Sequence, residues 1–373
     1  MRTGTPGRVL MTTDTVGGVW TYAIDLARAL GQSGVEVVMA SMGASASREQ
    51  RRQAGQIPTL ELFESSYRLP WMEQPWQDVR LATDWLLDLA ARTDPDLVHL
   101  NEPVFGSAPW PAPTLAVAHS CVVSWWQSVR GTEPPDEWSC YRREMGRGLR
   151  AAHRVVAPSQ WMLDEVRRYY GVVGGVVIPN GRHAANLYPE SKEPLVFAAG
   201  RLWDAAKNLA VLEEIAHRLA WPVMIAGEAR HPDSNRQVTA EHVRLLGQLP
   251  ADAVAAWLRR AGIYAFPARY EPFGLSVLEA ALAGCALVLG DLPTLRELWD
   301  GAAIFVSPDR ADDLRVALEG LIEDSALRQA LAMRARRRAL AYTPDRMARA
   351  YLEVYADLLS SSGSYAEETA CAS

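Results

Sequence analysis

The chain has 373 residues, of which 49% are hydrophobic and 22% are charged, and its formal net charge is -6. This composition is typical of a globular protein, the length favours two domains, and a chain that is disordered throughout is excluded. The acidic balance disfavours nucleic-acid binding and broad attraction to anionic membranes, and the sequence has no apolar run of the roughly 18 residues that a membrane helix needs.

Strand-like runs alternate with helical patterns along the chain, which predicts βαβ units and largely parallel sheets. A first strand is predicted at 8–13, followed by a loop with Gly17 and Gly18 and a helix over about 19–30. The segment 41–77 is predicted to be irregular, with one short strand in PTLELF. The other strands predicted in this half are 35–40, 97–100, 114–118, 154–157 and 176–178.

The turn cluster Pro179-Asn180-Gly181 marks the predicted domain boundary, with one domain over 1–182 and the next over 183–343. A last helix is predicted from about 344 to 359, before a small, polar and therefore disordered tail over 360–373. The second half is predicted to hold strands at 195–199, 222–226, 262–266, 286–289 and 302–306, and helices at about 207–219, 251–260, 275–284, 311–323 and 325–340.

The strongest functional pattern is the string FPARYEPFGLSVLEA over 266–280, which places a loop and then a helix after a strand. The N–H groups and positive dipole end of such a helix suit a diphosphate, and Gly274 permits close backbone approach. Glu279 lies about one turn into the helix, within reach of ribose hydroxyls, and Glu271 precedes the helix, within reach of a sugar. The plainer alternative is that both glutamates only favour the helix dipole.

A second pattern, GRLWDAAKN over 200–208, follows the first strand of the second domain. Arg201 and Lys207 would neutralise two phosphates there as a guanidinium fork and a point charge. Only two of the 38 basic residues are lysines, Lys192 and Lys207, so a lysine at this position indicates a need for a compact ammonium. A solvated helix start is the alternative.

Three weaker patterns lie in the first half. The loop with Gly17 and Gly18 follows the first strand and is either a phosphate loop, although it is not GxGxxG, or a plain turn. His119 ends a strand and would present a ring nitrogen or its carbonyl to a sugar. The alternative is a half-buried histidine whose hydrogen bonds are all made within the protein. Trp125 and Trp126 are either an aromatic platform for an acceptor or part of the core, and Asn101 follows a strand at either a cleft or a surface position.

Together these strings resemble the retaining glycosyltransferases of family 4, also called glycosyl transferases group 1, from about residue 8 to 359. The most specific marks are E-P-F-G-L-x-x-L-E-A, the G-R-L…K segment and P-N-G. The resemblance implies a GT-B fold of the α/β class, with two Rossmann-like domains that face each other across a cleft and a C-terminal helix that crosses back to the first domain. The chain departs from the usual P-N-G-V-D, since Arg182 and His183 follow the glycine.

The resemblance also implies roles for individual residues. Arg201 and Lys207 bind the diphosphate, Glu279 holds the ribose, and Glu271 and His119 contact the donor sugar. The catalytic candidates are therefore Glu271, His119, Arg201 and Lys207. The donor-binding candidates are Gly17, Gly18, Arg201, Lys207, Phe273, Gly274, Leu275 and Glu279, with Gly247 and Leu249 from a base-edge loop over 246–250. The acceptor-binding candidates are Trp125, Trp126 and Asn101.

The activity implied is transfer of a sugar from a UDP- or GDP-type donor to a hydroxyl of a sugar, glycolipid or small natural product, with retention and without a metal or bound cofactor. A sugar phosphorylase, a nucleotide-sugar epimerase and a catalytically silent sugar-binding subunit stay open as alternatives. The sequence leaves the donor, the acceptor and the oligomeric state undetermined. Four scattered cysteines without a CxxC pair and the lack of a signal peptide predict a cytoplasmic location.

Overall fold

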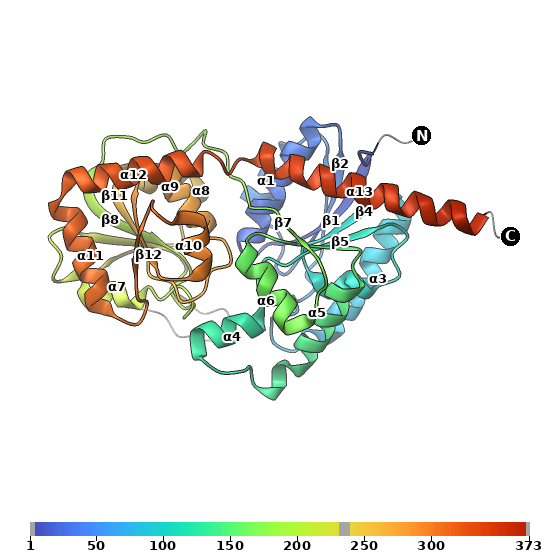
Figure 1. Cartoon of the computed structure of the whole chain (residues 1–373), viewed down its shortest axis with the longest axis horizontal. Coiled ribbons are helices and arrows are strands. Elements are labelled where there is room, and N and C mark those ends of the chain that lie inside the picture. Colours follow the sequence, from blue (N-terminus) through green and yellow to red (C-terminus); the bar gives the residue numbers. More distant parts are fainter. Residues whose placement is uncertain (1–3, 231–238, 371–373) are drawn as a thin grey trace. The chain divides into compact units, whose positions relative to one another are not determined.

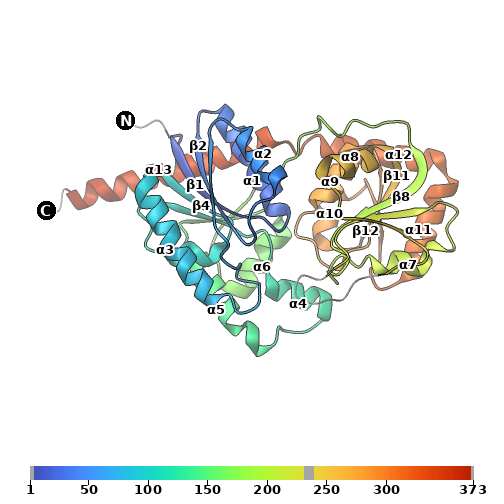
Figure 2. The same ribbon diagram turned by 180° about the vertical axis from the view of Figure 1, so that it is seen from behind.

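The structure is a computed structural model that describes residues 4–230 and 239–370, with the side chains of the last helix described as far as residue 361. The chain divides into two compact units (Figures 1 and 2). Unit 1 comprises residues 1–126, 132–181 and 344–373, and unit 2 comprises residues 127–131 and 182–343. Each unit therefore brings together segments that are not contiguous in the chain.

Unit 1 is built on a seven-stranded parallel sheet with the strand order β3-β2-β1-β4-β5-β6-β7. The chain adds β2 and β3 on one side of β1 and then β4 to β7 on the other side, so the order reverses between β1 and β4. Its strands are β1 Arg8–Asp14, β2 Glu36–Met42, β3 Leu60–Glu64, β4 Leu97–Leu100, β5 Thr114–Val117, β6 Arg154–Ala157 and β7 Val176–Val177.

Helices cover both faces of this sheet (Figure 1). Alternate strand residues point to opposite faces, so Val9 and Met11 of β1 join one core and Leu10 joins the other. The first core is completed by α1 (Gly18–Gln32) and α13 (Pro344–Ala370). The second core is completed by α3 Trp76–Thr93, α5 Ser139–Ala151 and α6 Gln160–Tyr170. The remaining unit 1 elements are α2 Arg48–Gly55 and the 3-10 helices η1 Pro103–Ser107 and η2 Asp136–Trp138, and α4 Val122–Arg130 has residues 122–126 in unit 1 and 127–130 in unit 2.

Unit 2 repeats this plan with a six-stranded parallel sheet in the order β10-β9-β8-β11-β12-β13. Its strands are β8 Glu193–Ala199, β9 Val223–Ala226, β10 Arg244–Gly247, β11 Ala261–Phe266, β12 Ala286–Gly290 and β13 Ile304–Val306. Its helices are α7 Ala210–Ala216, α8 Ala251–Arg260, α9 Leu275–Leu282, α10 Pro293–Trp299, α11 Ala311–Glu323 and α12 Ser325–Ala339. The predicted α/β class with two parallel-sheet domains is confirmed.

The sequence analysis gave no bounds for α3, α4, α5 and α6, and the structure differs from its expectations at four further elements. The segment 41–77 holds α2, whose polar surface shows no apolar period, and β10 includes the first two residues, 246 and 247, of the expected base-edge loop. The seven-residue helix α10 was not expected either. Helix α13 continues through 360–370, where a disordered tail was predicted, although four serines and a glycine there are weak helix formers, because the turns packed in the first core provide a formed helix from which it extends. Residues 371–373 of that tail lie outside the described residues.

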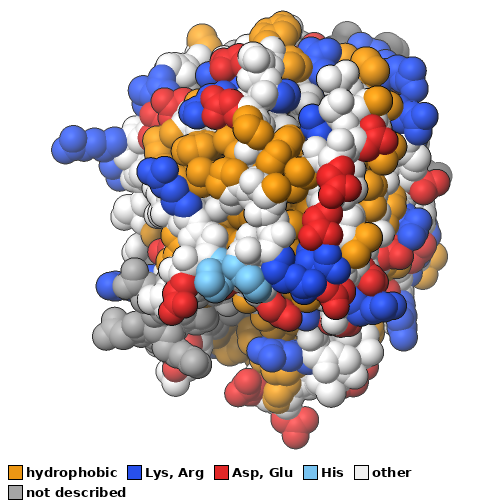
Figure 3. Space-filling model, turned by 90° about the vertical axis from the view of Figure 1, so that its left-hand side faces the viewer, with side chains coloured by type: hydrophobic (Ala, Val, Ile, Leu, Met, Phe, Trp, Pro, Cys, Tyr) orange, Lys and Arg blue, Asp and Glu red, His pale blue; other side chains and the backbone are white. Residues whose placement is uncertain are grey.

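The exposed surface mixes charges of both signs. On the face drawn in Figure 3, acidic and basic side chains lie among apolar ones. Among the described helices, none combines the length and the apolar character needed to cross a membrane.

Candidate active site

The chemistry predicted for unit 2 gathers where its strand order reverses. Strands β8 and β11 are neighbours, with β9 and β10 on one side and β12 and β13 on the other. In open α/β sheets, ligands bind beyond the carboxyl ends of strands at such a switch point. The loops that leave these two strands are 200–208 and 267–274, which carry the two strongest sequence patterns.

An ion pair joins these two loops. Lys207 Nζ lies 2.6 Å from Glu271 Oε2, and the exposed fractions of the two side chains are only 18% and 13%. The other oxygen of Glu271 accepts a hydrogen bond from the Phe273 N–H at 3.3 Å. Lys207 Nζ also lies 5.4 Å from the centre of the Phe266 ring. The loops therefore hold one compact cation and one carboxylate side by side at the switch point.

Arg201 lies on the same loop as Lys207. Its Nη2 donates to Asp204 Oδ2 at 2.7 Å, and its guanidinium lies 5.2 Å from the Trp203 ring. Burial alone would raise the pKa of Asp204, but the charges of Arg201 and Lys207 outweigh it and hold that pKa below its usual value. Within the described residues, Nε of Arg201 is buried without a hydrogen-bond partner. The guanidinium thus retains a donor for an incoming acceptor group.

Helix α9 begins directly after this loop. Its N-cap, Gly274, has a φ of 90°, in the left-handed region that favours glycine, and an added Cβ would lie 3.2 Å from Cγ2 of Val277. The first turn of α9 has no acidic residue, and no side chain of the described chain caps it. Since the first N–H groups of a helix have no intrahelical partner, the amides at Leu275 and Ser276 present positive charge at the same point.

Glu279, expected at the ribose, forms an ion pair that the sequence did not reveal. Arg182 donates from Nε and Nη2 to Glu279 Oε1, at 2.8 and 2.7 Å. Arg182 is the residue by which the chain departs from P-N-G-V-D. Arg182 therefore brings a positive charge to the carboxylate of Glu279. The unusual sequence at 179–183 was the only indication of this ion pair.

The expected base-edge residues lie next to the same loops. Gly247 ends β10 and its carbonyl accepts from the Gly227 N–H at 2.9 Å. Leu249 packs against the core of unit 2. Gly227 has no room for a side chain, because an added Cβ would lie 1.7 Å from the carbonyl oxygen of Gly200. The β8, β9 and β10 ends are therefore in close backbone contact.

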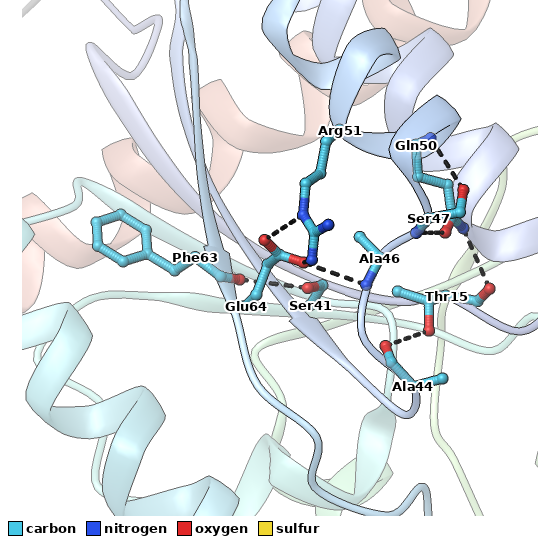
Figure 4. Close-up of polar contacts among 9 residues, drawn as sticks. All are labelled: Thr15, Ser41, Ala44, Ala46, Ser47, Gln50, Arg51, Phe63 and Glu64. Atoms are coloured by element: carbon cyan, nitrogen blue, oxygen red, sulfur yellow. Dashed lines mark hydrogen bonds and ion pairs between the residues drawn. The ribbon is translucent and has the colours of Figure 1, made fainter.

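In unit 1, Gly17 lies in a loop that is tied to its neighbours. Asp14 Oδ1 accepts from the N–H groups of Val16 and Gly17 at 2.8 and 3.0 Å, so the Gly17 amide is already used within the loop. Gly18 begins α1. Gln50 Nε2 donates to the Thr15 carbonyl at 3.1 Å (Figure 4).

The segment after β2 braces this loop (Figure 4). Ser47 and Gln50 form a capping box at the start of α2, with hydrogen bonds of 2.8 and 3.1 Å. Thr15 Oγ1 donates to the Ala44 carbonyl at 2.7 Å, and Arg51 forms a two-pronged ion pair with Glu64. Helix α2, which the sequence analysis missed, therefore holds the β1 loop in place, and the S-x-x-Q pattern at 47–50 was its signal.

His119, at the end of β5, is oriented by Asn101. Asn101 Nδ2 donates to the Thr12 carbonyl at 2.6 Å, which turns Oδ1 toward Nε2 of His119 at 2.8 Å and Nε2 of His99 at 3.2 Å. Because an amide oxygen only accepts, these two contacts are hydrogen bonds when each histidine carries its proton on Nε2, and Nε2 of His99 also lies 3.2 Å from the Tyr22 hydroxyl. Burial lowers the pKa of His119 to about 3, so the ring is neutral, with Nδ1 unprotonated.

The hydrogen-bond network that orients His119 continues into the core. Burial lowers the pKa of His99 to about 3, with a smaller contribution from the charge of His119. With its proton on Nε2, His99 accepts at Nδ1 from the Tyr355 hydroxyl of α13 at 2.6 Å. Tyr22 of α1 packs edge-on against His119, with ring centres 4.5 Å apart. Asn101 is thus buried with both ends of its amide engaged, in a positioning rather than an exposed role.

Two further features flank these residues. Burial and, to a smaller extent, the nearby charge of Asp14 raise the pKa of Glu102 to about 8, so this carboxyl is largely protonated at neutral pH. Trp125 and Trp126 of α4 are half-buried and meet edge to face, with ring centres 5.7 Å apart. Among the described residues, no three His, Cys, Asp or Glu side chains are grouped so as to hold a metal ion.

The predicted site residues thus fall into two sets. The unit 2 set, gathered around the ends of β8 and β11, is Arg201, Lys207, Glu271, Phe273, Gly274, Leu275 and Glu279, with Gly247 and Leu249 beside it. The unit 1 set, around the ends of β1, β4 and β5, is Gly17, Gly18, Asn101 and His119, with Trp125 and Trp126 on α4. Each set lies at the carboxyl edge of its own sheet.

Comparisons with known proteins agree with this geometry. The family model described as Glycosyltransferase Family 4 matches residues 16–185, and the model described as Glycosyl transferases group 1 matches residues 193–324. The chain is 31% identical over 228 residues to a phosphatidyl-myo-inositol mannosyltransferase of Mycolicibacterium smegmatis. That match covers 56% of this chain and 59% of the relative, so the chain spans less than two thirds of that protein.

Solved structures share the fold. Sucrose-phosphate synthase from Thermosynechococcus elongatus has a TM-score of 0.80 at 18% identity, with 95% of this chain and 99% of that chain covered. The Anabaena protein HepE, in complex with UDP-glucose, has a TM-score of 0.73 at 18% identity, with 94% and 100% covered. With both halves of the chain matched by models of one enzyme class, the chain belongs to the family 4, or group 1, glycosyltransferases and has their GT-B fold.

Proposed function

We propose that this glycosyltransferase moves a hexose from a nucleotide-diphosphate sugar of the UDP or GDP type to an acceptor hydroxyl, with retention of configuration and without a metal ion or bound cofactor. The observation that carries the proposal is the Lys207–Glu271 pair at the switch point of unit 2, beside the uncapped N-terminus of α9. The relative named as a mannosyltransferase and the HepE complex with UDP-glucose support a nucleotide-sugar donor.

The positive groups of unit 2 would hold the diphosphate. Lys207, the guanidinium of Arg201 and the N–H groups at the start of α9 all lie at the carboxyl edge of the unit 2 sheet, and together they would stabilise the negative charge that develops on the leaving phosphate. This fixed positive charge supplies the role that a metal ion has in other transferases. Glu279, which forms an ion pair with Arg182, would accept hydrogen bonds from the ribose.

The sugar would lie between the diphosphate and the acceptor. Glu271 exchanges its contact with Lys207 for sugar hydroxyls when the phosphates bind Lys207. His119, held neutral with its proton on Nε2, accepts a hydrogen bond from a sugar hydroxyl at Nδ1. The acceptor hydroxyl then attacks the face from which the phosphate leaves, and the phosphate oxygen takes its proton. That geometry retains the configuration at the anomeric carbon.

Nucleotide binding tests the proposal. Calorimetry with UDP, GDP, ADP and TDP is expected to give a micromolar dissociation constant for UDP or GDP, lost in Lys207→Ala. Transfer with the matching α-linked donor is then expected to give an α-linked product by proton NMR, with full activity in chelator. A β-linked product would refute retention, and loss of activity in chelator would refute metal independence. Binding of no nucleotide would refute the assignment of the site.

We place this activity in the cytoplasm. Within the described residues, Cys121, Cys140 and Cys285 form no disulfide, which a reducing compartment would favour.

A further inference from the structure

Unit 1 also contains a pocket of about 450 Å³, and none of its lining residues is a candidate site residue described above. It is lined by the first turns of α3 and α5 and by η1 with the two residues after it. Figure 2 shows α3 and α5 side by side in unit 1. This volume is in the range of pockets that bind small organic ligands.

The rim of the pocket is basic. Arg80 of α3 is exposed and makes no hydrogen bond or ion pair within the described residues. Arg143 and Arg147 of α5 share Glu144, at 2.9 and 3.1 Å. Three arginines and one glutamate leave two positive charges, on a chain whose net charge is -6. A phosphomonoester carries a charge of about −1.5 to −2 at neutral pH, which complements this rim.

The floor of the pocket is apolar and partly aromatic. Trp76, Val79, Val104 and Phe105 line it, and Trp76 is only half-buried. Arginine forks bind phosphate oxygens in pairs, and an aromatic face packs on a ring. A basic rim above an apolar floor therefore fits a ligand with a phosphate ester at one end and a ring at the other.

The pocket lies at the carboxyl edge of the unit 1 sheet. Helix η1 begins three residues after the end of β4, and Asn101, which orients His119, lies between them. Helix α5 leads into β6 from its C-terminus, so its first turns, which line the pocket, lie at the opposite, carboxyl end of the strands. The pocket and His119 therefore open on the same edge.

We propose that this pocket binds a phosphate ester and that, on the basis of the transferase function proposed above, the ester is part of the acceptor. The phosphate lies among Arg80, Arg143 and Arg147, and the ring of the acceptor lies on Trp76 with a hydroxyl directed toward the His119 edge. The same chemistry is offered by a soluble sugar phosphate and by a phospholipid headgroup.

The test is calorimetry of the full-length chain with phenyl phosphate, in the Lys207→Ala background so that the diphosphate site does not compete. Arg80→Gln and Arg143→Gln are each expected to weaken binding about fivefold, because each removes one exposed charged contact. Glu144→Gln is expected to strengthen binding, because it removes the opposing charge. The matched control is Arg142→Gln on the same helix, whose side chain pairs with Glu133 and does not line the pocket.

Unchanged affinity in Arg80→Gln and Arg143→Gln, or an equal loss in Arg142→Gln, would overturn the proposal. Inorganic phosphate that binds as tightly as phenyl phosphate would overturn the role of the apolar floor. Vesicles of phosphatidylcholine with phosphatidylinositol separate the two sources: sedimentation that Arg80→Gln abolishes and Arg142→Gln preserves identifies a lipid headgroup, whereas binding of the soluble ester alone identifies a sugar phosphate.

The outcome is independent of nucleotide binding. UDP and GDP affinities, measured in the otherwise native chain, are expected to be the same with and without Arg80→Gln. If phenyl phosphate binds in the Arg80-dependent manner but no nucleotide binds, the pocket stands and the transferase function fails. If nucleotide binds and phenyl phosphate does not, the transferase function stands and the acceptor assignment fails.

Discussion

The carboxylate of Glu271 opposes the ligand that Lys207 is proposed to bind. Its Oε2 lies 2.6 Å from Nζ, so it neutralises the ammonium while the site is empty of phosphate. Replacing it with glutamine keeps the shape of the side chain and an oxygen that still accepts from Lys207. We therefore expect Glu271→Gln to tighten the binding of UDP or GDP while it lowers the rate of sugar transfer.

The magnitude follows from Coulomb's law. A phosphate oxygen bound to the other side of Nζ would lie about 5 Å from the carboxylate. Two unit charges at that distance repel by about 0.8 kcal/mol in water and by about 3 kcal/mol at an effective dielectric constant of 20. Both side chains of the pair are mostly buried, at 18% and 13% exposed, so we expect an intermediate gain of about 1.4 kcal/mol, or tenfold in affinity.

Calorimetry with the nucleotide diphosphate measures the affinity, and initial rates with the full donor measure transfer. Glu193→Gln is the matched control, because Glu193 pairs with Arg260 at 2.6 Å but begins β8, at the end of that strand opposite Lys207. Its affinity is expected to equal that of the unmodified chain. If Glu271→Gln weakens nucleotide binding as much as Lys207→Ala does, the carboxylate holds Lys207 in place and does not compete with phosphate, and this reasoning is refuted.

Three further changes test other parts of the site. Gly274→Ala forces alanine to a φ of 90°, so we expect it to lower the free energy of unfolding by about 1–2 kcal/mol and to weaken nucleotide binding measured by calorimetry. Gly320→Ala on α11, with open space around it, is expected to change neither quantity. Asn101→Ala leaves the Nε2–H of His119 without its acceptor and leaves that of His99 with the Tyr22 hydroxyl at 3.2 Å. We expect a loss of about 2 kcal/mol in unfolding free energy and a change in the ¹⁵N NMR signal of His119, and an unchanged signal would contradict its proton on Nε2. The pKa of Glu102 in the folded chain is raised to about 8, so the native chain loses stability as the pH rises from about 5 to 8. Glu102→Gln removes that loss, so the Tm of the variant relative to that of the native chain is expected to increase over this range and to level off above it.

Much of the fold could be predicted because its strands are buried runs with strong hydrophobic character. Strand β6 and helices α8 and α11 have the bounds that the sequence indicated. Helix α2 was missed because its residues are polar except for Ala54 and Gly55, so no apolar period marks it, and the short capping pattern was the only local sign. Strand β10 is a four-residue edge strand, too short for alternation to show.

The unit 2 set could be predicted because its residues cluster in two short strings. The Arg182–Glu279 pair could not, since its members are 97 residues apart and meet only once the sheet has formed. Asn101 illustrates a different limit. Its place after a strand was readable, but its role depends on which atoms meet Thr12 and the two histidines, and hydrogen-bond geometry of that kind is a property of the packed core.

The position of α13 in the chain bears on how the molecule is made. Unit 1 takes its last helix from residues that follow the whole of 182–343, and Met347, Tyr351 and Tyr355 of that helix are part of its first core. During synthesis, the first sheet therefore leaves the ribosome with the face beneath α13 still open to water, while most of unit 2 has its complete sequence and is able to fold. His99 gains its Tyr355 partner only when translation reaches the C-terminal region. The nascent chain must keep one apolar face from aggregating until then, and the unit 1 side of the site is the last part of the enzyme to mature.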